Sequence, residues 1–231
     1  MKNTGYLILL FTALLIGLYS CKNNDEVFVT VKYTYITAIN AGADTLNFYL
    51  NGTRQNNASS ISPAGSPGML VVPSGLQNYE FKKAGQSVVL FSLPLNLAYN
   101  TFNSVYVTGE SANSVFKTVD TIPQLNTAQT DTLTAVRFVN AAPDAGNLNV
   151  FIGDTVNFKS AAFKSSSKFN LTGRGKKKVT VYLAGIATPI IDTPIIFQPA
   201  VSYTLYTKGL LNGKGNAAFG LGLLINQIPQ N

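Results

Sequence analysis

The feature that most constrains the fold is an internal repeat with a period of about 100 residues. Three blocks recur in the same order, in the pairs Ala38–Asp44 and Phe138–Asp144, Leu46–Gly52 and Leu148–Asp154, and Val105–Gly109 and Leu205–Gly209. A period this long is that of a whole domain rather than of one solenoid turn. The sequence therefore predicts two tandem copies of one domain.

Both copies have the residue pattern of short β-strands. Runs rich in valine, threonine, tyrosine and isoleucine, several of them alternating, occur at Thr34–Ile39, Ser87–Phe91, Val105–Thr108, Lys178–Leu183 and Tyr203–Thr207. Turn pairs such as Asn51-Gly52 and Asn212-Gly213 punctuate the chain, and no amphipathic helix is found after residue 21. The predicted fold class is all-β, with two tandem immunoglobulin-like antiparallel β-sandwich domains after a lipoprotein signal peptide.

Composition sets the predicted domain boundaries. Residues 27–120 form the first predicted sandwich and residues 134–231 the second. Residues 121–133 include the polar, aperiodic stretch Thr121–Thr132 (TIPQLNTAQTDT), which is typical of a linker.

The N-terminus is predicted to be a secretory signal peptide, residues 1–20. Lys2 precedes an apolar run, Tyr6–Leu18, which is shorter than the roughly 20 residues needed to span a bilayer. Leu18-Tyr19-Ser20-Cys21 resembles a bacterial lipobox, whose cysteine is acylated, and Cys21 is the only cysteine of the chain. Cys21 is therefore the predicted lipidation site. The alternative is a signal peptide with a chance cysteine, or a short uncleaved anchor.

Residues 21–26 would then be the lipidated cysteine and a polar tether. Asp25 and Glu26 follow closely behind Cys21, which resembles the surface-export signal of Bacteroidota-type lipoproteins. The predicted location is the cell envelope, lipid-anchored to the outer membrane, with surface exposure left open. The predicted partner of the lipid is the membrane.

A family resemblance rests on the second copy. Val136–Asp144 (VRFVNAAPD), followed by Leu148–Phe151 (LNVF), resembles the opening of domain-of-unknown-function family 4397 (DUF4397), whose members occur in bacterial surface lipoproteins, often in tandem. The resemblance covers residues 134–226 and, more loosely, residues 31–120. It implies an extracytoplasmic, immunoglobulin-like sandwich and no established activity.

The composition opposes catalysis. The chain has no histidine and one cysteine, and only 12% of its residues are charged, so triads with an imidazole base and histidine metal sites are excluded. The few carboxylates are scattered, whereas a glycosidase needs two at a set separation. We therefore predict a protein that is not an enzyme, with no catalytic residues, no metal site and no cofactor.

The two copies share an Asn and an Asp in equivalent positions, Asn40 with Asp44 and Asn140 with Asp144. Either aspartate could be a calcium ligand or a catalytic carboxylate. The interpretation preferred is structural, with each aspartate bonding its own backbone to close an Asx-type turn that the asparagine also caps. Calcium usually takes about six to eight oxygens, and no acidic cluster stands nearby in the sequence.

Basic charge is concentrated in the second copy. Residues 134–231 hold ten basic and three acidic residues, whereas residues 27–120 hold five basic and four acidic ones. Four of the ten lie in one glycine-punctuated turn, at Arg174, Lys176, Lys177 and Lys178. These residues form a candidate anion-binding site. The alternative is a solvated turn whose lysines keep strand edges from pairing.

Taken with the exclusions, these features predict a non-catalytic binding or adhesion module of the cell envelope. Its ligand would be a glycan or an anionic surface ligand, and nucleic acid is not expected. Two alternatives remain: a structural accessory subunit or spacer bound to an envelope protein, and a hydrolase, which the residue counts oppose.

Overall fold

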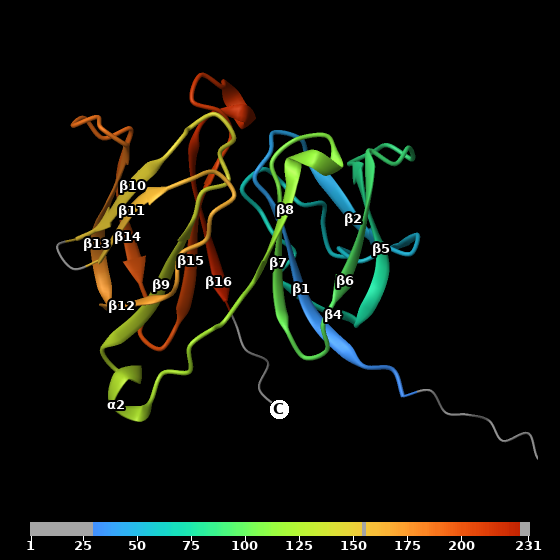
Figure 1. Cartoon of the computed structure of the whole chain (residues 1–231), viewed down its shortest axis with the longest axis horizontal. Helices are drawn as coiled ribbons and strands as arrows, with labels where there is room; N and C mark the ends of the chain where they lie inside the picture. Colours follow the sequence, from blue (N-terminus) through green and yellow to red (C-terminus); the bar gives the residue numbers. More distant parts are fainter. Residues whose placement is uncertain (1–29, 154–155, 227–231) are drawn as a thin grey trace, which may run out of the picture. The chain divides into compact units, whose positions relative to one another are not determined.

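The structure, a computed structural model, describes residues 30–153 and 156–226, and the regular secondary structure of these residues is almost entirely β-strand (Figure 1). The strands form four sheets in two sandwich-like units. The predicted all-β fold class is therefore confirmed. The strand patterns account for it, since an alternating strand buries one face and needs a second sheet to cover that face.

The first unit has eight strands in two sheets. One sheet has the order β4-β1-β7-β8 and the other the order β3-β2-β5-β6. Their bounds are β1 Tyr33–Asn40, β2 Leu46–Leu50, β3 Thr53–Arg54, β4 Met69–Pro73, β5 Gly75–Lys83, β6 Phe91–Leu97, β7 Phe102–Val107 and β8 Val115–Val119. A short 3₁₀ turn, Ala112–Ser114, precedes β8.

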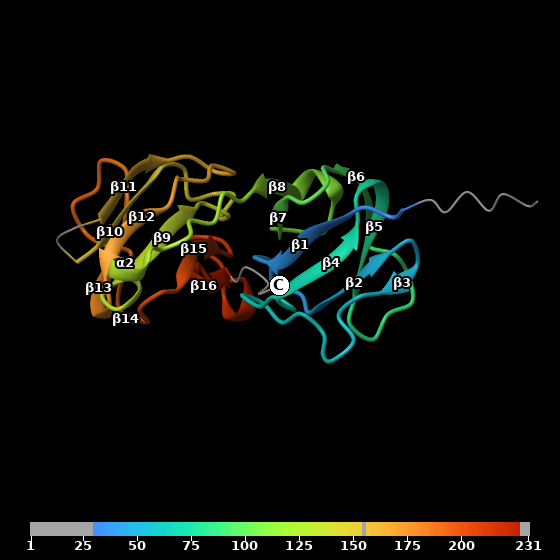
Figure 2. The same ribbon diagram turned by 90° about the horizontal axis from the view of Figure 1, so that it is seen from below.

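The second unit repeats this arrangement strand for strand. Its sheets have the orders β12-β9-β15-β16 and β11-β10-β13-β14, and Figure 2 shows β9, β15 and β16 side by side. The bounds are β9 Leu133–Val139, β10 Leu148–Ile152, β11 Val156–Ala161, β12 Asn170–Gly173, β13 Gly175–Leu183, β14 Ile191–Phe197, β15 Ser202–Lys208 and β16 Gly220–Asn226. The shared order agrees with the sequence repeat.

One pairing in each unit differs from the antiparallel expectation. β1 pairs with β7 in parallel, and β9 pairs with β15 in parallel. All other strand pairs of the described residues are antiparallel. The first strand of each unit thereby lies between an antiparallel strand, β4 or β12, and a parallel strand from later in the repeat, β7 or β15.

One predicted strand is wrong. Ser87–Phe91 was expected to be a strand from its valines, but β6 begins only at Phe91 and runs through Pro94. Val88 and Val89 are exposed in the preceding loop, at 73% and 38% of their surface. Proline is tolerated because β6 ends its sheet, so one side of its backbone has no neighbouring strand.

Between the units, the polar stretch predicted as a linker contains one helical turn, α2 (Thr127–Thr130). Asn126 caps it: its side chain accepts from Gln129 N, and the Gln129 side chain accepts from Asn126 N. No helix of the described residues is long and apolar enough to cross a membrane. Leu18, Tyr19, Ser20 and Cys21 lie outside the described residues.

Each sandwich has its own apolar core. Phe48, Tyr79 and Phe81 lie in the first, with the Phe48 and Tyr79 ring centroids 5.7 Å apart. Phe138 and Val181 lie in the second. Burial raises the pKa of Tyr79 to about 12.

A third apolar cluster joins equivalent residues of the two units. It contains Ile39 with Val139, Ala41 with Ala141, and Tyr106 with Tyr206. The Tyr106 and Tyr206 rings meet edge to face with centroids 5.9 Å apart. Burial raises the pKa of both side chains far above the ordinary value for tyrosine. The cluster is therefore built from the same positions of the two repeats.

Candidate functional site

The asparagines at the ends of β1 and β9 close the predicted turns. Asn40 Oδ1 accepts from Gly42 N at 3.1 Å, and Asn140 Oδ1 accepts from Ala142 N at 3.2 Å. Both side chains are buried, and their Nδ2 groups donate to the carbonyls of Ile61 and Ala161. Each asparagine therefore ties its turn to the following loop. The contacts of both asparagines are therefore within the fold.

The side chains of Asp44 and Asp144 contact residues far away in the sequence, so the prediction that they bond their own backbone is wrong. The Asp44 carboxylate forms an ion pair with Lys83 Nζ at 2.9 Å, and Glu110 contacts the same ammonium at 3.1 Å. The Asp144 carboxylate accepts from Leu211 N through both oxygens, at 3.1 and 3.0 Å. The asparagine side chain already occupies the turn amide, which leaves the aspartate to hold a distant loop. Among the described residues no group of three His, Cys, Asp or Glu could hold a metal ion.

The basic turn predicted to bind anions is the short connection between β12 and β13, which belong to different sheets of the second sandwich. Arg174 lies at its tip and donates from Nη1 to Asp131 O at 2.7 Å. Gly175 has φ +100°, a conformation that favours glycine. The three lysines belong to β13 itself, with Lys176 and Lys178 exposed and Lys177 half-buried.

Strand geometry divides these lysines between two faces. Successive side chains of a strand point to opposite sides, and Val179 and Val181 point into the core. Lys176 and Lys178 therefore lie on the outer face with Thr180 and Tyr182, whereas Lys177 lies on the other side. β13 is an inner strand, between β10 and β14, so the alternative explanation that these lysines protect a sheet edge is wrong.

The charges on the outer face are partly compensated. Lys178 Nζ lies 2.9 Å from Asp192 Oδ2 on β14, and this hydrogen bond raises the pKa of Lys178 above its ordinary value. No ion pair is formed by Lys176 with the described residues. The predicted four-residue cluster is therefore reduced to two lysines on one face, one of them paired.

The same outer face carries an open, shallow groove of about 430 Å³. It is lined by Asn149, Phe151, Gly153, Thr180, Tyr182 and Ile186. The Phe151 and Tyr182 rings meet edge to face with centroids 5.7 Å apart. The sequence did not single out this groove, because it forms from β10 and β13, which lie about 30 residues apart in the chain.

The first unit has a different surface at the equivalent place. Its β2 and β5 present Tyr49 and Lys82, the counterparts of Phe151 and Tyr182, and the Lys82 ammonium lies 4.5 Å from the Tyr49 ring centroid. The lysine covers the aromatic face there. The two copies share a fold but not this site.

The fold and the site define a class: an all-β chain of two tandem sandwiches, the second with an aromatic groove beside lysines. The chain matches no protein-family model and no curated protein.

Solved structures similar to the chain include three β-rich proteins. One is a family 26 carbohydrate-binding module of Eubacterium rectale in complex with maltoheptaose, with 8% identity over 84% of this chain and 98% of that one, at a TM-score of 0.26. Two are candidate cell adhesion proteins, from Bacteroides fragilis (10% identity, 82% and 86% covered, TM-score 0.22) and Bacteroides eggerthii (9%, 85% and 96%, 0.22). At these TM-scores the likeness carries no conclusion about function.

Proposed function

We propose that the chain is a lipid-anchored, non-catalytic binding module of the cell envelope that takes an acidic glycan on the outer face of β10 and β13. The observation that carries the proposal is the groove at Phe151 and Tyr182 on the same face as Lys176 and Lys178. The proposal includes membership of DUF4397, which rests on the motif Val136–Asp144.

The groove has the chemistry that sugars need. Aromatic rings pack against the apolar faces of sugar rings, and Phe151 and Tyr182 are both half-buried, so part of each ring is open. The Thr180 hydroxyl makes no hydrogen bond with the described residues. It is available to a sugar hydroxyl, and a few such polar groups in an apolar pocket fix the orientation of a ligand.

The lysines select for negative charge. Lys176 and Lys178 project from the strand that supplies Thr180 and Tyr182, and Asp192 contacts Lys178. Exposed charges act on binding mainly through long-range attraction, which salt screens. An acidic polysaccharide is therefore favoured over a neutral one.

We predict that Lys176→Glu/Lys178→Glu weakens binding of acidic polysaccharides to residues 27–231 by about tenfold or more at about 0.15 M salt, because two attractive charges become repulsive. These residues contain every described strand. Binding to a panel of acidic and neutral polysaccharides and lipopolysaccharide is measured by calorimetry at about 0.15 M and about 1 M salt, where the screening length falls from about 8 to about 3 Å. Lys214→Glu reverses one charge, as each of the two substitutions does, in an exposed loop of the other sheet and serves as control. Salt-insensitive binding by the double variant would contradict the proposal.

The anchor is tested separately. We predict that Cys21→Ser moves the chain from the membrane fraction to the soluble fraction, because serine has no thiol to acylate and two or three acyl chains are needed for stable anchoring. Detergent-phase partitioning and the intact mass of the chain report the lipid. Ser20→Ala keeps a small residue before Cys21 and serves as control. A Cys21→Ser chain that still partitions into detergent would refute lipidation at this position.

One observation favours the second candidate, an accessory subunit with a protein partner. Tyr33 and Val71 lie on the outer face of the β4-β1-β7-β8 sheet, 51% and 59% exposed. Tyr35 on the same face stacks on Phe102 with ring centroids 4.7 Å apart. Exposed apolar strips of this kind mark protein contacts. Crosslinking in intact cells, with no binding to any polysaccharide, would move the assignment to this candidate.

A further inference from the structure

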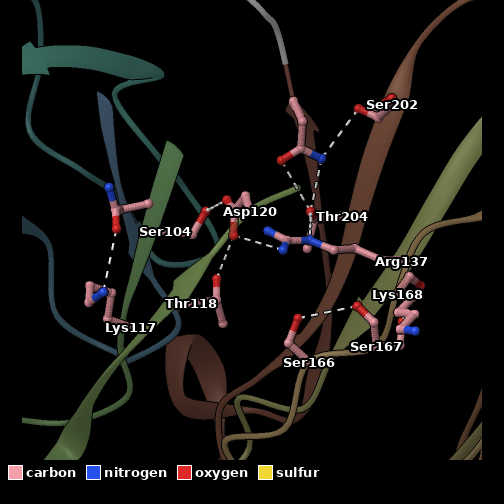
Figure 3. Close-up of polar contacts among 12 residues, drawn as sticks. Ser104, Lys117, Thr118, Asp120, Arg137, Ser166, Ser167, Lys168, Ser202 and Thr204 are labelled. Atoms are coloured by element: carbon pink, nitrogen blue, oxygen red, sulfur yellow. Dashed lines mark hydrogen bonds and ion pairs between the residues drawn. The ribbon is translucent and has the colours of Figure 1, made fainter. Parts of the chain in front are cut away.

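A second hollow, of about 610 Å³, lies where the two units meet, on elements that the proposed glycan groove does not use. The first unit and the following segment contribute Thr118, Val119, Thr121 and Pro123; the second contributes Arg137 and the loop Ser166–Phe169. Figure 3 shows Arg137 between Asp120 and this loop. A volume of this size is in the range of small-molecule sites, about 300–1,000 Å³.

The wall of the hollow contains a buried cation. Arg137 is 2% exposed and extends from β9 to the first unit, where Nη1 lies 2.7 Å from Asp120 Oδ1. Its Nε donates to Thr204 Oγ1 at 2.8 Å, and the Phe169 ring lies over the guanidinium with its centroid 5.0 Å from Cζ.

This cation keeps an unused donor. Arg137 Nη2 is buried and has no hydrogen-bond partner. Asp120 does not accept from this Nη2 group. Its Oδ1 also accepts from Thr118 Oγ1 at 2.7 Å, and its Oδ2 accepts from Ser104 Oγ at 2.5 Å. An orphan donor on a buried charge is costly and calls for a water, an ion or a ligand.

The rim of the hollow adds a second cation. Lys168 is exposed and forms no ion pair among the described residues. Ser166 beside it is exposed as well, and its hydroxyl makes only a long contact of 3.4 Å with Ser167 O. Because the charge of Asp120 compensates that of Arg137, the net charge at the opening of the hollow is +1, from Lys168.

We infer that this hollow binds a singly charged, carboxylate-bearing ligand of sugar size. Its carboxylate is held by Lys168 and the Arg137 guanidinium, and its ring lies against Phe169 and Pro123. A carboxylate is favoured over a phosphate dianion because one uncompensated charge matches one negative charge. The site is separate from the groove at Phe151 and Tyr182, which belongs to the other sheet of the second sandwich.

The test uses D-glucuronate, D-glucose and inorganic sulfate as probes on residues 27–231, with backbone amide shifts followed by NMR. We expect glucuronate to shift the amide signals of Thr121, Lys168 and Phe169 saturably. Glucose should cause no shifts, because it has no carboxylate. Sulfate should bind more weakly than glucuronate, because it has no ring. Lys168→Glu should weaken glucuronate binding about tenfold or more, since it replaces a positively charged donor by a carboxylate that repels the carboxylate of the ligand. Lys168 has no ion pair to lose, so the fold should survive.

Variants of the glycan groove distinguish this inference from the proposed function. Lys176→Glu/Lys178→Glu should leave glucuronate binding at the hollow unchanged, whatever it does to polysaccharides. Glucuronate shifts confined to Phe151 and Tyr182, equal shifts with glucose, or no shifts at all would each overturn the inference. Unchanged affinity in Lys168→Glu would do so too.

Discussion

Asp120→Ala is expected to destabilise the chain by about 3–5 kcal/mol, the range for removing one partner of a buried ion pair. The Asp120 and Arg137 side chains are 5% and 2% exposed and meet at 2.7 Å. Without the carboxylate, the guanidinium stays buried with both Nη groups unpaired, and the hydroxyls of Ser104 and Thr118 lose their acceptor. The midpoint and slope of urea unfolding measure the loss.

The control for this prediction is Asp192→Ala, which removes the acid of the exposed pair with Lys178 and should cost far less, because water screens that pair. A cycle with Arg137→Met completes the test. The double variant Asp120→Ala/Arg137→Met should lose less unfolding free energy than the two single variants lose together, because it leaves no unpaired buried charge. Equal losses of unfolding free energy in Asp120→Ala and Asp192→Ala would show that the buried Asp120–Arg137 pair stabilises the chain no more than an exposed pair does.

Gly222→Ala is expected to cost about 3 kcal/mol, the upper part of the range for overpacking a core. A Cβ at Gly222 would lie 2.1 Å from Tyr206 Cζ. Tyr206 cannot move away easily, because it is buried against Tyr106 and its hydroxyl donates to Ala64 O at 2.7 Å. In the first unit the residue paired with the equivalent tyrosine is Phe116, which stacks on Tyr106 with ring centroids 4.9 Å apart.

Gly220→Ala is the matched control on the same strand. Its Cβ would meet only the flexible end of Lys208, with Cε at 3.3 Å, so its urea midpoint should fall much less. Loss of the Tyr206 environment can be followed in the near-ultraviolet circular dichroism of the variant. A Gly222→Ala chain as stable as Gly220→Ala would mean that the Tyr206 ring has another place to lie.

The fold was largely predictable because its signals are local. Alternation in β1 and β13 specifies which face is buried, and turn residues such as Gly175 separate one strand from the next. The prediction failed at Ser87–Phe91, where β-branched residues are exposed in a loop and a proline-containing segment forms the strand instead. Residue type reports the preference of a segment, whereas a strand also needs a neighbour with free backbone groups.

The candidate sites were only partly predictable. Turn positions such as Asn40 and Asn140 can be proposed from the sequence, because their bonds to Gly42 and Ala142 are local. The run at Lys176–Lys178 was read as one patch, but a strand sends adjacent side chains to opposite faces. Which of them share a face with an aromatic groove depends on the pairing of β10 with β13.

By itself the sequence determined the all-β fold class and the repeat, because alternation, turns and a constant offset are properties of neighbouring residues. The tertiary structure alone decided that Arg137 meets Asp120, that Tyr206 lies over Gly222, and that a hollow forms between the units. The physical reason is that burial and pairing are set by the packing of segments far apart in the chain. A buried charge or a missing Cβ becomes significant only when its neighbour is in place.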